Sequence, residues 1–540
     1  MFGKFLENSI IGVTIPGNPM INIGKTDHYA WGATCSYIEN VDIYREEILP
    51  DGLTRKTDDP KAGKLTVIEE KIEIKGEPSY NLKVYKAKHG LLDCPILSRV
   101  KIGEQFLPLS EKLSLCWQGM RNEDYSMDYK FDILFNMTNR SALEMKNIAE
   151  KITLDAELLT VADDQGNIIL FNIGSVPKRN FSSDNWGYIL DGTKKENDWE
   201  GFIPPEDILY IMNPRKGFVA HANNKLAPSK FMKHHISRLT QPTSRYSRIQ
   251  YLISNAIKDT DKINSTFSMK LQQDNFDHYA NLVLSRIIHI GSRCLKFKGL
   301  DKDPVNEFML DQLNFWSRIS DAKSIGATIY YVNLMKISLK LLAKVSNHEH
   351  RTLIALYSNF DNFVFWQLEK LAKDLDENYE DACSTQLFKS KLSGDDVVQA
   401  FLEAKNWILE HFGPDPQSWK WGNLHTTQLE HQFYSNTPFH IYSNTKLSAS
   451  GFKYTPNAQA AVPSSDPDMF FQANHNPGFR MIANFGENSK SYYITDTGIN
   501  ENFFSPHYLD QLSLYAQGKY IEMKSGKENL KDLPYVLTFK

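Results

Sequence analysis

The chain changes its hydrophobic periodicity twice along its length, and this order of segments constrains the fold more than any single motif. Residues 10–92 carry the alternating apolar pattern of β-strands. Residues 245–410 carry apolar side chains mostly at helical spacing, and short strand patterns return from 419 onward, with a helix near 507–518. A β-rich part, a helical stretch and a second β-rich part predict an α+β fold with a helical domain inserted into its core.

Two β-hairpins and one helix are predicted before the helical stretch. Apolar and charged residues alternate in 70–75 and again in 82–84, and the intervening Gly-Glu-Pro marks a turn. The apolar segments 158–163 and 167–172 flank a short Asp, Gln and Gly turn, which predicts a second hairpin. Between the hairpins, residues 140–152 place apolar side chains at helical spacing.

These patterns divide the chain into three parts. Residues 1–244 are expected to form the first part of a β-rich sandwich core, 245–418 a mainly helical insertion, and 419–540 the return to the core with a C-terminal helix. The polar segment 180–201 is predicted to be a loop. Individual helices of the insertion are expected at 249–257, 279–290, 330–345 and 397–412.

The composition excludes several classes of function. The net charge is −4, from 61 Lys and Arg against 65 Asp and Glu, which indicates no nucleic-acid partner and no anionic membrane surface. The most apolar long stretch, Ile325 to Val345, is interrupted by Lys336, Lys340 and Lys344, which predicts a packed helix and no transmembrane segment. The five cysteines are odd in number and include no CxxC pair, so neither a disulfide framework nor structural zinc is expected.

Eight blocks of residues between 9 and 520 resemble, in the same order, segments of the penicillin acylase family. The first block, from Gly12 to Tyr44, contains GVTIPG and AWG, although residues 23–26 are Ile-Gly-Lys-Thr where the family has Ile-Gly-His-Asn. The others are KIEIKGEPSYNLKVYKAKHG, TVADDQGNI with the nearby GSVPKR, DWEGFIPPEDILYIMNPRKGFVAHANNK, LQQD, WKWGNLHTTQLEH, NPGFRM and FSPHYLDQLSLYAQGKY. The resemblance implies the N-terminal nucleophile hydrolase fold, a four-layer αββα sandwich, here incomplete, and the hydrolysis of linear amides through an acyl-enzyme.

The resemblance also implies a nucleophile that this chain does not display. In the family, a Ser exposed by self-cleavage attacks the amide, and its own α-amino group serves as the base, because an α-amine has a pKa near 8. That Ser is expected several dozen residues before the GVTIPG block, whereas eleven residues precede Gly12 here. Ser9 lies in a predicted strand and is a poor substitute, and nothing near Cys35 marks it as an activated thiol. A missing small chain or nucleophile segment is therefore an expected partner.

Three residues are expected in the active site by resemblance. The backbone N–H of Cys35, in WGATC, and the side-chain amide of Asn223, in HANNK, match the two donors of the family's oxyanion hole, which stabilise negative charge on the carbonyl oxygen. Without the resemblance, Asn223 would be interpreted as a turn residue. Arg245, in TSRYSRI, matches an arginine that braces the site, and its alternative is an exposed charge at the start of a helix.

Calcium is a possible structural cofactor by the same resemblance. The carboxylates of Glu39 and Asp42 and the carbonyls of Val41 and Pro177 match the family's ligands, which are the oxygen donors that a hard cation prefers. Two further carboxylate ligands of the family are not matched here, so two carboxylates would have to bind the ion where the family uses four. The alternative is a solvated acidic turn.

Two functions remain open from the sequence. The first is a penicillin-acylase-like hydrolase that acts on a small-molecule linear amide, as a chain missing its N-terminal nucleophile. The alternative is a catalytically inactive family member that acts as a binding or subunit-interaction protein. The acyl group of a substrate is not indicated.

The missing segment leads to a prediction about the chain by itself. The purified chain is expected to hydrolyse neither phenylacetyl nor long-chain acyl amides, because oriented donors have no attacking group to act with. Strand edges left unpaired between Gly12 and Ile23 are expected to make it aggregate or bind a partner. The measurements are amidase assays and size-exclusion chromatography; turnover that survives Ser9→Ala would contradict the account and require another nucleophile.

Overall fold

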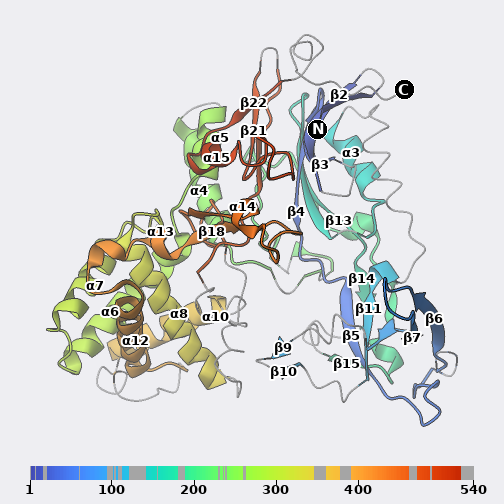
Figure 1. Cartoon of the computed structure of the whole chain (residues 1–540), viewed down its shortest axis with the longest axis horizontal. Coiled ribbons are helices and arrows are strands. Elements are labelled where there is room, and N and C mark those ends of the chain that lie inside the picture. The colour runs from blue at the N-terminus through green and yellow to red at the C-terminus, as the bar shows by residue number, and fades with distance from the viewer. Residues whose placement is uncertain are drawn as a thin grey trace. The chain divides into compact units, whose positions relative to one another are not determined.

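The chain forms two compact units, and each is described by itself (Figure 1). One unit comprises residues 1–241, 485–489 and 524–540, and the other comprises 242–484 and 490–523. The computed structural model describes residues 2–5, 8–15, 21–59, 61, 63–93, 101–102, 105–106, 112–120, 141–154, 156–180, 189–228, 231–234, 236–237, 240–259, 263–345, 361–377, 383, 391–460, 471–486 and 489–524. The three-part division expected from the sequence stays a prediction.

A seven-stranded antiparallel sheet organises the first unit. Its strand order is β1-β2-β3-β4-β12-β13-β17. The strands are β1 (Phe2–Phe5), β2 (Asn8–Thr14), β3 (Ile21–Thr26), β4 (Tyr29–Cys35), β12 (Glu157–Asp163), β13 (Ile168–Ile173) and β17 (Ile211–Met212). The predicted hairpin of β12 and β13 is confirmed. The unpaired edge expected between Gly12 and Ile23 is wrong, because residues 2–5 fold back as a neighbour of β2, and β3 pairs with both β2 and β4.

One face of this sheet is covered by α3 (Ala142–Ala149), which confirms the helix predicted there. Ser141 begins the helix with a capping box, in which its hydroxyl accepts from the Glu144 N–H and the Glu144 carboxylate accepts from the Ser141 N–H. Met145 of the helix is buried in the same hydrophobic core as Trp31 and Phe171 of the sheet. The apolar face of the helix therefore packs on the apolar face of the sheet, as the helical and strand spacings of their apolar residues predict.

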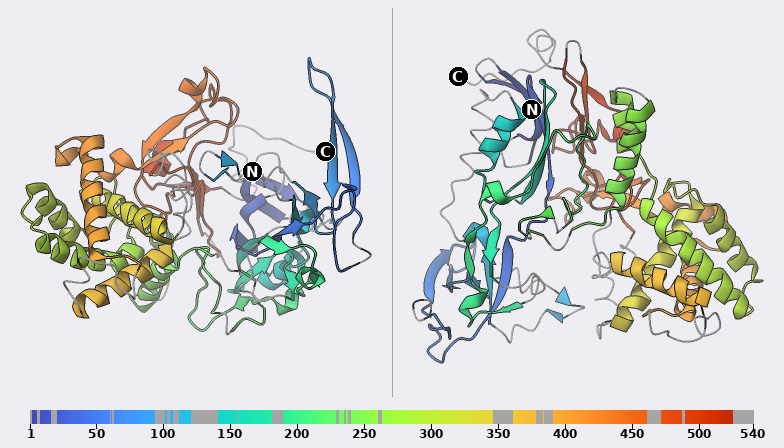
Figure 2. Two further views of the ribbon diagram at one scale, coloured as in Figure 1. Left: turned by 90° about the horizontal axis from the view of Figure 1, so that it is seen from below. Right: turned by 180° about the vertical axis from the view of Figure 1, so that it is seen from behind.

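A six-stranded sheet is the second large sheet of this unit. Its order is β15-β5-β11-β8-β7-β6. The strands are β5 (Val41–Glu46), β6 (Thr66–Ile72), β7 (Tyr80–Lys86), β8 (Leu91–Leu92), β11 (Lys112–Trp117) and β15 (Ile189–Asp191). The predicted hairpin of β6 and β7 is confirmed and forms a long ribbon at the edge of the sheet (Figure 2).

The loop predicted for 180–201 is confirmed around residues 192–198 but is wrong at its described ends, where two strands form. Strand β15 lies parallel to β5, and β16 (Trp199–Phe202) pairs with β14 (Pro177–Arg179). Strands β15 and β16 are three and four residues long, too short to show a strand periodicity, and they form because other strands offer them hydrogen-bond partners. Residues 181–188 lie outside the described part of the chain.

A buried charge network joins the strands of the six-stranded sheet. The His89 ring lies between two carboxylates, with Nδ1 2.7 Å from Glu46 Oε1 and Nε2 2.7 Å from Asp198 Oδ1. Glu46 also accepts from the Ser114 hydroxyl and from the Arg55 guanidinium. Both ring nitrogens of His89 therefore face carboxylate oxygens.

Gly90 allows the chain to turn at this network. Its φ is 146°, and a Cβ atom at this position would lie 1.8 Å from the Leu115 carbonyl oxygen. A side chain would therefore push the neighbouring strand away and displace His89 from its two carboxylates. This close approach gives the His-Gly pair of the second sequence block a structural reason.

Helices dominate the second unit and confirm the expected helical stretch. They are α4 (Ser244–Asp259), α5 (Ser265–Gln272), α6 (His278–Phe297), α7 (Pro304–Phe315), α8 (Ile325–Val345), α10 (Asp361–Glu377) and α12 (Gly394–Phe412). Helix α8 packs against α7, α10 and α12, with Tyr330, Tyr331 and Ile337 fully buried. Among the helices of the described residues, none is both long and apolar enough to cross a membrane.

Short elements follow the helices in the same unit. They are α13 (Trp421–Leu424), β18 (Thr426–Leu429), α14 (His440–Ser443), β19 (Thr445–Ser448), β20 (Phe479–Ile482), β21 (Ser491–Thr495), α15 (Leu512–Ala516) and β22 (Ile521–Met523). Strands β18 and β19 form one hairpin, and β20, β21 and β22 form a three-stranded antiparallel sheet. The strands predicted for this part are confirmed, and the helix predicted near 507–518 is present over the shorter range of α15.

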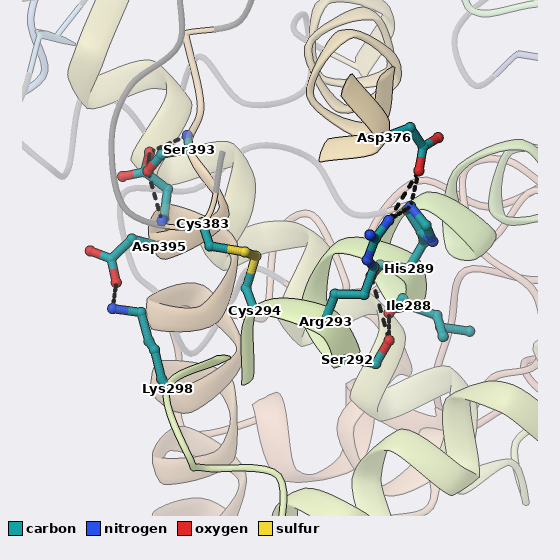
Figure 3. The surroundings of a disulfide bond; sticks show 11 residues. Ile288, His289, Ser292, Arg293, Cys294, Lys298, Asp376, Cys383, Ser393 and Asp395 are labelled. Carbon is teal, nitrogen blue, oxygen red and sulfur yellow. Dashed lines mark hydrogen bonds and ion pairs between the residues drawn. A yellow bond between two sulfur atoms is a disulfide. The ribbon is translucent and has the colours of Figure 1, made fainter. Parts of the chain in front are cut away.

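The structure departs from the expectation drawn from the cysteine count. Cys294 of α6 and Cys383 form a disulfide, next to an ion pair between Lys298 and Asp395 (Figure 3). The two cysteines are 89 positions apart in the sequence, and both are fully buried. An odd number of cysteines and the lack of a CxxC pair do not exclude a single disulfide between distant residues. The helix packing that brings Cys294 and Cys383 together is not visible in the spacing of the cysteines. Cys35 and Cys116 are free, and Cys94 lies outside the described residues.

The disulfide should stabilise the protein. Replacing Cys294 by Ala is expected to lower the free energy of unfolding by about 2–4 kcal/mol, because the bond closes a long loop in the unfolded chain. Denaturant unfolding with and without a reducing agent measures this, and peptide mapping without reduction should recover the cross-linked pair. Cys35→Ala is the matched control and should keep the sensitivity to reduction; a Cys294→Ala protein as stable as the unreduced wild type would contradict the prediction.

The charge network should make stability depend on acid. Burial raises the pKa of Asp198, but hydrogen bonds and charge from His89 and Lys88 outweigh it and lower the pKa to about 2. A carboxylate with a depressed pKa stabilises the fold above its unfolded pKa near 4, and this contribution is lost as the pH falls from about 4 to about 2. The difference in melting temperature between wild type and Asp198→Asn should therefore narrow over this range, whereas the exposed control Asp311→Asn should melt like wild type throughout. A difference that stays constant down to about pH 2 would contradict the prediction.

Candidate active site

Cys35 ends β4, and the pairing of this strand sets the direction of its backbone N–H. Cys35 stands opposite Glu157 of β12, and the next residue, Ser36, donates its N–H to the Ala156 carbonyl at 3.1 Å. Hydrogen-bonded and non-bonded pairs alternate in an antiparallel ladder, so the Cys35 N–H points away from β12. The thiol is free and exposed. The backbone donor expected from the sequence therefore lies outside the β4–β12 ladder.

Asn223 lies against the end of β4. Its side-chain Nδ2 donates to the Thr34 hydroxyl at 2.8 Å and to the Cys35 carbonyl at 2.9 Å. Its backbone has a φ of 61°, a left-handed conformation that Asn adopts more readily than most residues. The structure thus brings Cys35 and Asn223 into direct contact, although 188 positions separate them in the sequence. Their role in catalysis stays a prediction.

Neighbouring residues hold the Asn223 loop in place. The Asn223 N–H donates to Nδ1 of His221 at 3.1 Å, and Nε2 of the same ring donates to the Asn224 carbonyl at 2.7 Å. The Gln241 N–H donates to the Asn223 carbonyl, and the Gln241 side chain donates to the Tyr37 hydroxyl. Sequence reasoning missed Thr34 and these supports, because their partners lie elsewhere in the chain. The dense run of polar residues in AHANNK was the one local signal.

Arg245 lies in the first turn of α4, in the second unit. Its side chain is half-buried, and the preceding residue, Ser244, is buried. Its position on a helix start agrees with the sequence pattern, and its bracing role stays a prediction.

The residues expected to bind calcium gather around an arginine. The Asp42 carboxylate accepts from Nε of Arg179 at 2.8 Å and from Nε1 of Trp199 at 2.5 Å. The same guanidinium donates through Nη2 to the Glu39 carbonyl at 2.7 Å. Pro177 begins β14, two residues before Arg179, and Val41 begins β5.

This arrangement does not fit a calcium ion as it stands. A buried guanidinium already lies on the Asp42 carboxylate, and a divalent cation beside it would be repelled. Within the described ranges, no three His, Cys, Asp or Glu side chains come together as a metal site. Calcium at Glu39, Val41, Asp42 and Pro177 stays a prediction, and it requires Arg179 to move.

Comparisons with known proteins define the class of this fold. The structure of a thermostable penicillin G acylase from Alcaligenes faecalis matches with a TM-score of 0.69 and 16% identity, covering 100% of this chain and 93% of that one. The fold is therefore that of the N-terminal nucleophile hydrolases, which confirms the α+β class predicted from the sequence.

A family profile described as penicillin amidase matches residues 6–532. The chain belongs to the penicillin amidase family. The acyl-homoserine lactone acylase QuiP of Pseudomonas syringae pv. syringae is 24% identical over 96% of this chain. The penicillin acylase 2 proenzyme of a Pseudomonas species is 21% identical over 95% of it. The chain spans 61% of the length of each of these two curated relatives.

The Arg179 contacts predict how the protein responds to metal removal. Chelation with EDTA is expected to leave the melting temperature unchanged, because the guanidinium supplies the positive charge at Asp42. Arg179→Ala is expected to cost about 3–5 kcal/mol of stability, because it leaves the Asp42 carboxylate buried without its cation. Melting with EDTA and with added calcium measures both effects. A fall in the wild-type melting temperature that EDTA causes and calcium reverses would restore the calcium assignment.

Proposed function

We propose that this chain is part of a hydrolase that cleaves linear, non-peptide amide bonds of small molecules through an acyl-enzyme. The contact between Asn223 and Cys35 carries the proposal, because a side-chain amide lies beside a residue whose own N–H points out of the β4–β12 ladder. Amide hydrolysis needs such donors where negative charge grows on the carbonyl oxygen. Membership of the penicillin amidase family and relatives named as acylases support the same activity.

The geometry suggests how Asn223 would act. Its amide donates to two acceptors, the Thr34 hydroxyl and the Cys35 carbonyl. The bond to the Cys35 carbonyl is exposed and is exchanged, in this proposal, for a bond to the substrate oxygen. The part-buried bond to Thr34 keeps the amide oriented during the exchange. Asn223 and the Cys35 N–H are then the oxyanion donors, and Thr34 is a positioning residue.

The attacking group is proposed to be an N-terminal Ser on a segment outside residues 1–540. Its hydroxyl would attack the amide carbonyl, and its α-amine would take the proton near neutral pH. The amine product would leave first, and water would then release the acid from the acyl-enzyme. The family resemblance supports this nucleophile, and no residue of this chain is assigned the role.

The oxyanion assignment is tested by activity of the assembled enzyme. We expect the chain, assembled with a family small chain and a Ser-initiated strand, to hydrolyse phenylacetyl or long-chain acyl amides. Asn223→Ala should then lower kcat by about 100- to 1000-fold, as the loss of one oxyanion donor does elsewhere. The control Asn281→Ala removes an exposed Asn of α6 and should leave kcat unchanged.

Two results would count against the proposal. If Asn223→Ala changes the kcat of the assembled enzyme no more than Asn281→Ala does, Asn223 is not an oxyanion donor. An assembly that binds a phenylacetyl amide without turning it over would favour the inactive, ligand-binding alternative.

A further inference from the structure

A cavity of about 370 Å³ lies within the second unit, and its lining includes none of the residues of the candidate active site. Segments from α5, β18, β19, β20 and α15 contribute to its lining. Its volume is in the range of small-molecule sites. Unlike most such sites it is lined largely by polar side chains, among them Lys270, Asp321, Asn457, Asn476, Arg480 and Asp496.

Arg480 is the most unusual member of this lining. It lies on β20 and is 5% exposed. Its guanidinium lies 4.1 Å from the centre of the Tyr515 ring and donates through Nη2 to Asn457 Oδ1 at 2.9 Å. Its Nη1 is buried without a hydrogen-bond partner among the described residues, and none of their carboxylates forms an ion pair with the guanidinium. A buried guanidinium with an unpaired N–H group is costly, so Arg480 favours an added acceptor, and best an anion.

Asp496 supplies an acidic group to the same cavity. It follows β21, and its Oδ2 accepts from the Asn476 side chain at 2.9 Å. Burial raises the pKa of Asp496, and Asn476 and Arg480 oppose this effect only in part. Asp496 lies in the cavity lining and accepts one side-chain hydrogen bond, from Asn476, so an added cation or donor would stabilise its charged form.

Side-chain amides hold these charged groups in place. Asn457 accepts from Arg480 and donates to Asn275 Oδ1 at 2.9 Å. Gln459 donates to the Tyr515 hydroxyl at 3.1 Å, which holds the ring under the guanidinium. A set of polar groups that is already oriented loses little entropy when a ligand binds.

The charges of the lining define the ligand. Arg480 and the exposed Lys270 are balanced by Asp496 and the exposed Asp321, so the described lining carries no net charge. A strongly charged ion would meet a like charge on one side, whereas a ligand with one positive and one negative group would meet a partner for each. A guanidinium pairs best with a carboxylate, through two parallel hydrogen bonds.

We propose that this cavity binds a small zwitterion of the α-amino acid class, with its carboxylate on Arg480 and its ammonium on Asp496. The described lining of the site comes from the second unit and includes neither Cys35 nor Asn223. It gives the protein a binding function that does not depend on the proposed reaction.

Calorimetric titration of the purified protein tests the proposal with four probes. Glycine and L-alanine carry both charges, N-acetyl-L-alanine lacks the ammonium, and L-alaninamide lacks the carboxylate. We expect saturable binding of an amino acid and at least a tenfold weaker affinity for each probe that lacks one charge. Absence of saturable binding by glycine and alanine would overturn the proposal.

Variants then assign each charge to its residue. Asp496→Asn should abolish the preference for alanine over N-acetylalanine and keep the preference for alanine over alaninamide. Arg480→Gln should abolish the preference for alanine over alaninamide and keep the preference for alanine over N-acetylalanine. Arg480→Lys, which keeps the positive charge, should retain part of the preference for alanine over alaninamide, and it serves as the test if the Gln variant fails to fold. Asp311→Asn, on an exposed face of α7, is the control. Equal probe preferences in Asp496→Asn and Asp311→Asn would overturn the assignment of the ammonium.

Discussion

The pairing of β4 with β12 is the constraint on which the candidate active site depends. Seven consecutive residue pairs, from Tyr29 opposite Asp163 to Cys35 opposite Glu157, hold the two strands in register. A slip of one residue would turn Trp31 out of the core and turn the Cys35 N–H into the ladder. The hydrophobic core that Trp31 shares with α3 therefore also determines which way a backbone donor points at the end of the strand.

The charged groups buried in the first unit have hydrogen-bond partners supplied by the protein itself. His89 lies between two carboxylates, and Arg179 lies between a carboxylate and a carbonyl. The guanidinium of Arg480 in the second unit differs, because its one described hydrogen bond goes to a neutral amide. For this reason a ligand is inferred at Arg480, whereas Arg179 is a sufficient counter-ion for Asp42.

The sequence predicted elements whose signals lie within a short window. Hairpins β6–β7 and β12–β13, helix α3 and the long helices α6, α8 and α12 follow from apolar residues repeating every two or every three to four positions. Prediction failed where a neighbour in space supplied the order. Strand β15 forms because β5 accepts it, and residues 2–5 form a strand because they fold back on β2. The bond between Cys294 and Cys383 depends on how α6 packs, which the cysteine count does not contain.

The sequence by itself determined the α+β class, the family and the identity of the candidate donors Cys35 and Asn223, because periodicity and ordered blocks are properties of neighbouring residues. Only the tertiary structure decided that these two residues meet, that Arg179 lies on Asp42 and that Arg480 is buried beside a cavity. Each of these contacts joins residues that are far apart in the chain. Their formation depends on strand pairing and core packing, which are settled by the fold as a whole and by no local run of residues.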